Sequence, residues 1–299
     1  MTELLTPTLA HIVEAFHQMF PPQLAEGWDA AGLVLGRADR PVDRIGFAVD
    51  ATVATAQEAA REQAGLLITH HPLLLKGASF LPATDYKGEI VHTLIEAGCG
   101  LLGAHTNVDS APHGTNEAFM DCLGITDRQI LADEKNALIS GTERRVGIGR
   151  VGNLPEPLTL AQLAEKIAVF LPATAGGLRI AGHPETSVQK VALCTGAGDS
   201  LFAQARDSGA DVYITADLRH HPASEAREQA LLNGGKPALI DCSHYASEWL
   251  WMEETARLLS DALAQRGFAI STYVSTLNTD PWDFTVSTGY TPGSASTAG

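Results

Sequence analysis

The chain repeats one order of apolar and polar residues, and this repeat constrains its fold more than any other feature. In each half, an apolar run is followed by an acidic residue and an alanine-rich stretch. A second apolar run then ends in Ile-Thr, and the half continues to a His-His-Pro. The matching runs lie at 42–49 and 188–195, at 68–69 and 214–215, and at 70–72 and 220–222. This shared order predicts an internal duplication.

Short apolar runs alternate with alanine- and charge-rich runs along both halves. The runs at 44–49 and 65–69 are short and partly β-branched, whereas those at 54–64 and 90–98 have the composition of helices. Such alternation is typical of α/β proteins, in which helices cover a sheet. We therefore predict an α/β fold with two similar α/β lobes, and a functional site in the cleft between them.

The repeat also suggests domain boundaries. We predict a first lobe over 1–125, and a middle segment with the second lobe over 126–285. The middle segment, about 125–187, has no counterpart in the first half and contains an apolar helical pattern at 159–171. The last residues are rich in Ser, Thr and Gly, so 286–299 is predicted to be a disordered tail.

Composition and charge exclude several classes of protein. The 299 residues include 35 acidic and 20 basic ones, a formal net charge of −15, which disfavours binding to nucleic acid or to an anionic membrane. The four cysteines form no C-x-x-C pair, and no apolar run approaches the roughly 18 residues of a membrane span. The first 20 residues have the pattern of an amphipathic helix and not of a signal peptide. We predict a cytoplasmic protein.

Two adjacent imidazoles follow the first Ile-Thr, at His70 and His71. The carboxyl end of a strand is where open α/β sheets place their sites. Adjacent residues on an extended chain point to opposite sides, so these histidines could serve two metals, or one metal from a bent chain. A pair of loop or capping histidines is an equally good interpretation of this motif alone.

A second group, His105, Asn107 and Asp109, follows the next apolar run. A carboxylate can bridge two cations, which suits Asp109 to a central position. Taken alone, however, the segment is better explained as a turn in which Asn107 and Asp109 bond backbone donors.

A third group begins a predicted helix after the apolar run 237–241. His244 and Glu248 lie four residues apart, so a helix places both on one face. A histidine and a carboxylate one turn apart form a common chelating pair. An ordinary exposed helix pair is the alternative.

The three groups together supply more ligands than one closed zinc site needs. They fit two cations about 3.5–4 Å apart, with open positions for water. Nitrogen and oxygen ligands without thiolate admit Zn, Mn, Fe, Co or Ni, and the spacing does not choose among them. The predicted metal ligands are His70, His71, Asp109, His244 and Glu248, with His105 as a further candidate.

Two further groups of residues are candidates for supporting roles. Asp217, His220 and His221 could bind another metal, line the cleft or form a plain polar loop; we predict His220 and His221 as proton donors to a substrate. Trp28 could wall the cleft and Asp29 could orient a ligand imidazole. A core tryptophan beside a turn aspartate is the alternative for this second pair.

Several motifs resemble the NGG-one-interacting-factor-three-like (NIF-three-like) family, whose members are described as dinuclear-metal-centre proteins. Many of them carry the name GTP cyclohydrolase 1 type 2 homolog. The similarity covers roughly residues 8–284. The motifs that carry it are GWDAAGLVLG, DAT at 50–52, ITHHPLL, AHTNVDSAPHGTNEA, ADVYITADLRHH and IDCSHYASE.

The resemblance implies a ring-shaped homohexamer with two divalent cations per chain, held by the five ligands named above with His105 close by. It also implies that an inserted domain found in some members is absent, because the segment 125–187 is too short to hold one. The leading hypothesis is a metal-dependent hydrolase, in which two cations lower the pKa of a bridging water. In the cyclohydrolase version, taken from the resemblance, the water attacks a guanine ring of a nucleotide. The alternative is a non-catalytic metal-binding or scaffold protein.

Overall fold

The computed structural model describes residues 4–287. Each half of the chain has an amphipathic helix that starts at a threonine cap. Helix α1 (Leu9–Met19) starts at Thr8, whose side chain accepts a hydrogen bond from the backbone of His11. Helix α6 (Leu160–Phe170) starts in the same way at Thr159. Such capping satisfies backbone donors that a helix start leaves free. The predicted helix at 159–171 is therefore confirmed.

The first sheet has five strands in the order β1-β4-β3-β2-β11. Strands β4, β3, β2 and β11 run parallel to one another, and β1 runs antiparallel to β4 at the edge. Helices α2 (Val53–Arg61) and α3 (Tyr86–Ala97) connect β2 to β3 and β3 to β4. The strands are β1 (Gly32–Leu35), β2 (Arg44–Ala48), β3 (Leu66–Thr69), β4 (Gly100–Gly103) and β11 (Ser271–Val274).

The second sheet has six strands in the order β5-β6-β8-β9-β10-β7. Its central strands β8, β9 and β10 are parallel, and helices α7 (Phe202–Asp207) and α8 (His220–Leu232) connect them. The strands are β5 (Arg128–Ile139), β6 (Thr142–Thr159), β7 (Arg179–Ala181), β8 (Ser187–Ala197), β9 (Val212–Ala216) and β10 (Ala238–Cys242).

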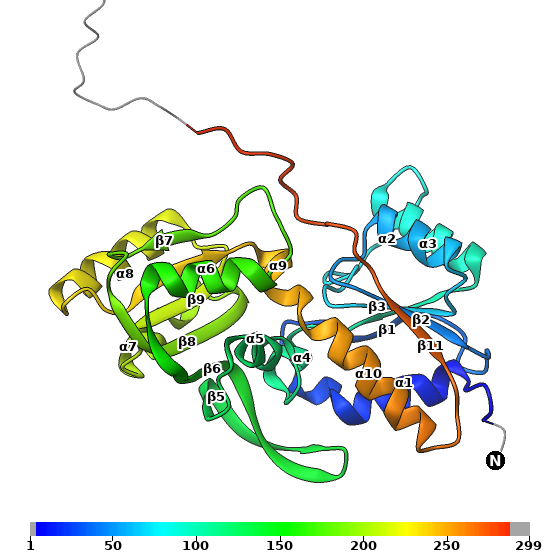
Figure 1. The fold of residues 1–299 in the computed structure, drawn as a ribbon. Helices are drawn as coiled ribbons and strands as arrows, with labels where there is room; N and C mark the ends of the chain where they lie inside the picture. The colour runs from blue at the N-terminus through cyan, green and yellow to red at the C-terminus, as the bar shows by residue number, and fades with distance from the viewer. Residues whose placement is uncertain (1–3, 288–299) are drawn as a thin grey trace, which may run out of the picture.

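The α/β architecture with two lobes matches the prediction (Figure 1). The order β1-β4-β3-β2 in one sheet corresponds to β7-β10-β9-β8 in the other, with an antiparallel strand beside β4 and beside β10. This correspondence is consistent with a duplication. The two His-His-Pro motifs are not structurally equivalent, however. His70 follows β3 directly, whereas His220 begins α8 after three residues that separate it from β9.

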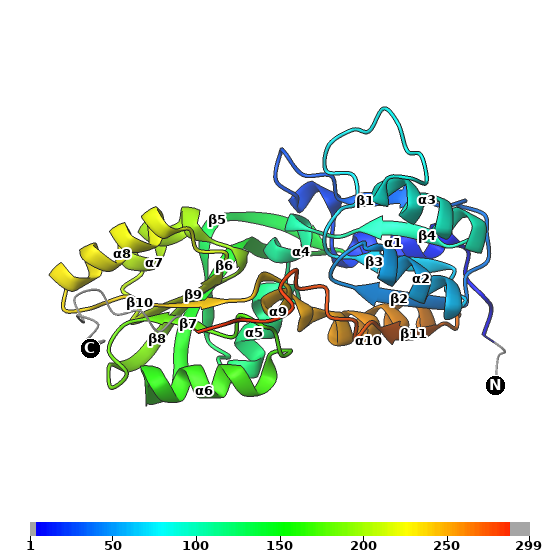
Figure 2. The same ribbon diagram turned by 90° about the horizontal axis from the view of Figure 1, so that it is seen from above.

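The lobes exchange helices across their junction. Helices α4 (Thr106–Ser110) and α5 (Thr115–Leu123) follow β4, and α9 (His244–Trp249) and α10 (Trp251–Ala264) follow β10. The apolar side chains of α5 pack into the core under the second sheet, with those of α6. Those of α10 pack into the core under the first sheet, with those of α1. Figure 2 shows α10 running beneath the first lobe and α5 beside the second.

Alternation along the strands sorts side chains between two layers on each sheet, because successive residues of a strand point to opposite faces. In β3, Leu66 and Ile68 face α1 and α10, whereas Leu67 faces α2 and α3. In β9, Val212 and Ile214 face α5 and α6, whereas Tyr213 faces α7 and α8. Each lobe is thus a sheet between two helical layers. One layer of each lobe includes a helix from the other half of the chain, α10 in the first lobe and α5 in the second.

Two more segments cross between the lobes. The hairpin of β5 and β6 extends from the second sheet under the first lobe, where the Ser140 N–H donates to the Gln18 carbonyl at 2.7 Å (Figure 1). Strand β11 lies beside β2 in the first sheet although it follows α10. The boundary predicted at 125/126 falls between α5 and β5, but no single cut separates the sheets together with all their covering elements.

Only the first two residues of the predicted disordered tail are among the described residues. Residues 286 and 287 of the predicted tail lie in no helix or strand, and 288–299 lie outside the described residues. Within residues 4–287, no helix combines the length and the apolar character that crossing a membrane requires.

Candidate metal centre

The six predicted ligands meet at the junction of the two lobes. His70 and His71 extend from β3. Their backbone N–H groups donate to the carbonyls of Ala48, the last residue of β2, and of Val49, at 3.1 and 2.9 Å. The other residues follow β4 and β10. Nitrogen and carboxylate atoms lie within 4.8 Å of one another in three overlapping groups. These groups are His70, His71 and His105; His71, His244 and Glu248; and His70, Asp109 and Glu248.

Glu248 lies at the centre of the cluster and is only 2% exposed. Its Oε1 is 3.3 Å from His70 Nε2 and 3.1 Å from His244 Nε2. Its Oε2 is 3.1 Å from His71 Nε2. The Asp109 carboxylate is farther out, 3.7 Å from His70 Nε2. Glu248, and not Asp109 as the sequence suggested, is therefore the carboxylate that two of the three groups share.

In all four imidazoles the same ring nitrogen, Nδ1, is hydrogen-bonded to an oxygen acceptor. A carbonyl or an ionised carboxylate can only accept a hydrogen bond, so Nδ1 carries the proton and the Nε2 lone pair is left for another partner. This is the arrangement typical of metal-binding histidines. The pairs are His70 with Ala104 O at 2.8 Å, His71 with Asp50 at 2.7 Å, His105 with Asp29 at 2.9 Å and His244 with Asp217 at 2.7 Å.

The structure distinguishes between the two interpretations of Trp28 and Asp29. Asp29 accepts from His105, and the Thr106 N–H and hydroxyl hold its other oxygen at 3.0 and 2.5 Å. The prediction that Asp29 orients an imidazole of the cluster is confirmed. Trp28 is 60% exposed and packs edge-on against His105, with ring centroids 5.7 Å apart. It is not a core residue.

The second lobe holds Asp109, although Asp109 belongs to the first half of the chain. The Thr115 hydroxyl donates to Asp109 Oδ1 at 2.5 Å, and the Thr195 hydroxyl of β8 donates to Thr115 at 2.8 Å. The Asn116 amide donates to the Asp109 carbonyl and accepts from the Thr195 N–H, both at 3.0 Å. The position of this carboxylate therefore depends on contact between the lobes.

Gly196 lies directly against the cluster and was not predicted as a site residue. Its φ of +67° is in the left-handed region, and an added Cβ would overlap Glu248 Oε1. Its N–H donates to the Ser247 hydroxyl at 3.0 Å. Only glycine combines this backbone conformation with space for the Glu248 carboxylate. A glycine at the end of β8 was the available sequence signal, but sequence alone does not reveal what it approaches.

Charges within the cluster shift the protonation of its members. Burial favours neutral imidazole, but the negative charge of Glu248 and the hydrogen bonds to Asp50 and Asp217 together outweigh it. They raise the pKa of His71 to about 10 and that of His244 to about 11. Burial raises the pKa of Glu248, but the positive charges of the histidines hold it well below its usual value. Burial also raises the pKa of Asp109. Protons therefore occupy the imidazoles of His71 and His244 when no other cation is bound.

Two buried polar atoms of the cluster give a further indication that it fits divalent cations. His70 Nε2 and Glu248 Oε2 are buried, and neither makes a well-aligned hydrogen bond among the described residues, although His70 Nε2 lies 3.3 Å from Glu248 Oε1 and Glu248 Oε2 lies 3.1 Å from His71 Nε2. A buried polar atom without a partner costs about 1–3 kcal/mol, so a native structure normally supplies one. Imidazole nitrogens and carboxylate oxygens are ligands for Zn and its first-row neighbours. A cation at this position would satisfy both orphaned atoms.

A cavity of about 690 Å³ opens beside the cluster, with His71 and His244 in its wall. Arg179 and Trp282 also line it, and the Trp282 side chain is 70% exposed. Such a volume lies within the range typical of small-molecule sites, about 300–1,000 Å³. The cluster is therefore accessible from a space that could hold a substrate.

The cluster does not include His220 or His221. Both are exposed at the start of α8, and His220 lines a neighbouring cavity of about 440 Å³. Arg179, Leu218 and Asp241 line both cavities. Asp217, grouped with these histidines in the sequence, instead accepts from His244.

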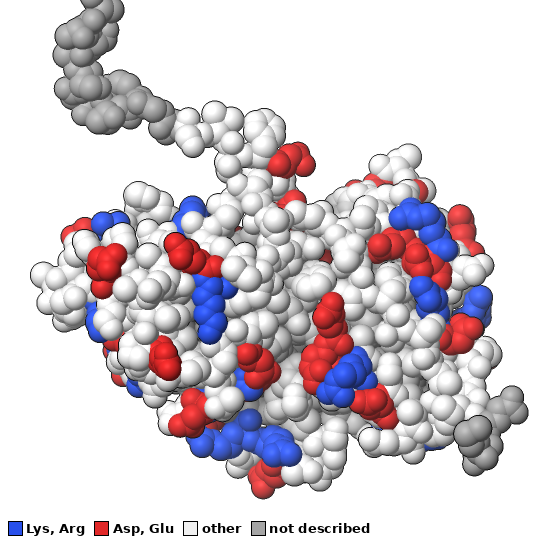
Figure 3. Space-filling view, in the orientation of Figure 1, with Lys and Arg blue, Asp and Glu red and all other residues white. Residues whose placement is uncertain are grey.

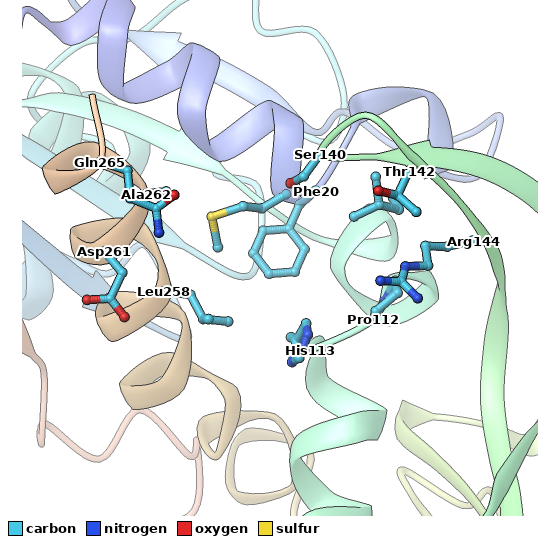
Figure 4. A pocket seen from close by; sticks show the side chains of 12 residues that line it. Phe20, Pro112, His113, Ser140, Thr142, Arg144, Leu258, Asp261, Ala262 and Gln265 are labelled. Atoms are coloured by element: carbon cyan, nitrogen blue, oxygen red, sulfur yellow. The ribbon is translucent and has the colours of Figure 1, made fainter.

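A further cavity of about 540 Å³ lies away from the cluster, between α1, α10 and the β5–β6 hairpin (Figure 4). Phe20 and Leu258 form part of its apolar floor, and His113 and Arg144 lie at its rim. None of the predicted site residues lines it.

The fold and the site define a two-lobed α/β protein whose lobes together build a cluster of histidines and carboxylates. The chain belongs to the Duf34/NIF3 (NGG1p interacting factor 3) family, whose sequence model matches residues 7–281. The family resemblance inferred from the motifs is thereby confirmed.

Two similar proteins with curated names share one name. A Streptomyces coelicolor protein called GTP cyclohydrolase 1 type 2 homolog is 43% identical, over 92% of this chain and 94% of its own length. A Mycobacterium bovis protein of the same name is 30% identical, over 94% and 98%. That alignment spans 381 positions, more than the 299 residues of this chain, so the mycobacterial protein has residues without a counterpart here.

Solved structures support the fold. A Bacillus cereus protein related to NIF3 superposes with a TM-score of 0.82 at 23% identity, over 94% of this chain and all of that one. A hypothetical protein of Staphylococcus aureus superposes with a TM-score of 0.81 at 27% identity, over 93% and 100%.

Proposed function

We propose that this protein binds two divalent cations in the cluster and uses them to activate water for hydrolysis. The observation that carries the proposal is the common orientation of the four imidazoles, each held at Nδ1 and each with Nε2 left for a metal. Two groups of three donors share Glu248, as a pair of cations requires. The metal is Zn, Mn, Fe, Co or Ni.

Each cation has its own proposed ligands. His71, His244 and Glu248 would hold one cation, and His70, Asp109 and Glu248 would hold the other. His105 lies beside His70 and His71 and is a further candidate ligand.

A pair of bound cations supplies a water whose pKa lies near neutrality. The residues of this chain then prepare the site for that water. Asp50, Asp217 and Asp29 keep the proton on Nδ1 of their histidines, which leaves Nε2 for a metal. His220 and His221 stay candidate proton donors. His220 lines the neighbouring cavity, which shares Arg179 and Asp241 with the cavity beside the cluster.

The proposed substrate is a nucleotide. This extension rests on the printed name of the relatives, GTP cyclohydrolase 1 type 2 homolog, and on the cavity beside the cluster. The exposed face of Trp282 can stack on a planar base. The Arg179 guanidinium can reach a phosphate, although it also pairs with Asp241. A homohexameric ring and a cytoplasmic location are proposed on the family resemblance alone.

The face in Figure 3 carries acidic and basic side chains side by side, without a broad basic area. Together with the net charge of −15, this supports a small-molecule substrate in preference to a nucleic acid.

The test compares two double variants by elemental analysis and by turnover of GTP with Zn²⁺ or Mn²⁺. The wild type is expected to hold about two cations per chain and to lose turnover with a chelator. The variant His71→Ala/Asp109→Ala is expected to lose metal, and the matched variant His220→Ala/His221→Ala to keep it. Full metal content in the first variant would overturn the metal site. Metal binding without turnover of GTP or other nucleotides would overturn the hydrolase and favour a scaffold.

A further inference from the structure

The chain beyond β11 crosses from the first lobe to the second over the opening beside the cluster. In this segment, residues 275–285 and here called the strap, Ser275 is tied to the first lobe by its N–H, which donates to the Phe47 carbonyl at 2.7 Å. The Trp249 indole donates to the Ser275 carbonyl at 3.0 Å. Figure 1 shows the strap, in red, leaving β11 and passing between the lobes.

On the second lobe, the strap meets the loop between α6 and β7. The Asn278 amide donates to the Ala173 carbonyl at 3.1 Å, and the Thr285 hydroxyl donates to the Ala175 carbonyl at 3.0 Å. The strap is therefore anchored to both lobes, and its residues Thr279 and Trp282 line the cavity beside the cluster.

Between these anchors, the strap reaches the hydrogen-bond network of the candidate metal centre. The Thr279 hydroxyl donates to Asp50 Oδ2. The other oxygen of the same carboxylate, Oδ1, accepts from His71 Nδ1 at 2.7 Å. One carboxylate thus joins a strap hydroxyl to a proposed metal ligand.

The three carboxylates that hold imidazoles differ in how they are themselves held. Thr106, a neighbour in the same lobe, holds Asp29. The side chain of Asp217 is 60% exposed, and it accepts a hydrogen bond from His244. Asp50 is held by Thr279, which lies 229 residues away along the sequence, the largest such separation among the three.

We propose that Thr279 is a positioning residue of the metal centre, which fixes the Asp50 carboxylate and through it the His71 imidazole. This inference rests on the proposed function. The terminal torsion of an aspartate is broad, so a single hydrogen bond leaves the carboxylate plane free to turn. A second hydrogen bond to the opposite oxygen fixes that plane and keeps Oδ1 directed at His71 Nδ1. His71 Nε2 is then presented to its cation without the cost of ordering the ring on binding.

The strap offers a matched pair of substitutions. Thr279→Val and Thr285→Val each remove one strap hydroxyl and one hydrogen bond, but only the first of these hydroxyls contacts Asp50. Thr279→Ser keeps the hydroxyl and removes only a methyl group. Differences between the variants therefore report on the bond to Asp50 and not on attachment of the strap.

The experiment titrates Co²⁺ into the full chain by calorimetry and records the visible absorption of the bound Co²⁺. Thr279→Val is expected to weaken one of the two Co²⁺ sites about 10-fold or more, the usual cost of losing an outer contact of a ligand, and to change its spectrum. Thr279→Ser and Thr285→Val should match the wild type. Wild-type binding by Thr279→Val, or equal weakening by Thr285→Val, would overturn the role of Thr279 alone. A wild type without Co²⁺ sites would overturn the proposed function and this inference together.

Discussion

His70 and Glu248 come from opposite halves of the chain, yet Glu248 Oε1 lies 3.3 Å from His70 Nε2 in a buried cluster. His70 follows the third strand of the first half, and Glu248 lies in the helix after the last parallel strand of the second sheet. Neither lobe could form the site alone.

Glu248→Gln should leave the fold intact and weaken metal binding. The amide has nearly the same shape, but it lacks the negative charge that both proposed cations share. Calorimetric titration with Zn²⁺ checks the affinity. A cooperative thermal melt in chelator checks the fold, with a midpoint lowered by the loss of the pairs between Glu248 and the imidazoles. If both sites kept their affinity, Glu248 would not be a ligand.

Gly196→Ala should abolish binding of at least one cation, because its Cβ would overlap Glu248 Oε1. Gly209→Ala is the matched control: its φ of +72° is similarly left-handed, but nothing lies within 4 Å of the added Cβ. Both variants should lose about 1 kcal/mol of stability from backbone strain. Only Gly196→Ala should lose metal in elemental analysis, and equal metal contents would contradict the steric argument.

Metal binding at pH 7 should release protons. The pKa of His71 is raised to about 10 and that of His244 to about 11, so both imidazoles are protonated before a cation replaces the proton on Nε2. About two protons per chain should therefore be released. Calorimetry in buffers of different ionisation enthalpy measures this number. An enthalpy independent of the buffer would show that the imidazoles bind metal without releasing protons.

The same raised pKa values predict how the metal-free protein responds to alkali. A group with a raised pKa in the folded state stabilises fully below its unfolded value, about 6.5 for histidine. That contribution is lost progressively as the pH rises from there toward 10 or 11. Melting temperatures in chelator should therefore fall between about pH 7 and pH 10. The His71→Ala/His244→Ala variant should show a smaller fall.

Divalent cations should stabilise the folded chain, because the ligands come from both lobes. A cation that binds only the folded state adds about 2.7 kcal/mol at a concentration about 100 times its Kd. Thermal melts with increasing Zn²⁺ should show a rising midpoint. The same titration of His71→Ala/Asp109→Ala should leave the midpoint unchanged, and a parallel rise there would place the stabilising metal elsewhere.

The proposed hexamer predicts a mass near six times the 31.6 kDa of one chain. Light scattering at micromolar concentration measures it directly. A stable monomer would contradict the ring.

The sequence predicted the six cluster residues for a physical reason. Each follows a short apolar run, and open α/β sheets place their sites at the carboxyl ends of parallel strands. Here such ends from both sheets meet. His244 and Glu248 were further linked by helical spacing, which needs no knowledge of the rest of the fold. Whether the cluster holds metal stays a prediction.

Other features depended on distances that the sequence does not contain. The second His-His-Pro looked equivalent to the first, but the positions after Ile-Thr in the second half are Ala216 and Asp217, and His220 belongs to the next helix. The roles of Asp50 and Gly196 follow from contacts across the site. The exchange of α5 and α10 could not be predicted, because an amphipathic pattern shows that a helix covers a sheet but not which one.

That exchange has a consequence during synthesis. Strands β1 to β4 of the first sheet are complete once the ribosome has passed residue 103, but the core beneath them waits for Trp251 and Leu259 of α10. His70 and Asp109 are made long before Glu248. A nascent first half therefore has neither a closed core nor a complete candidate cation site. Synthesis of α9 and α10 completes both. Binding of the proposed cations therefore has to wait until α9 and α10 have been made.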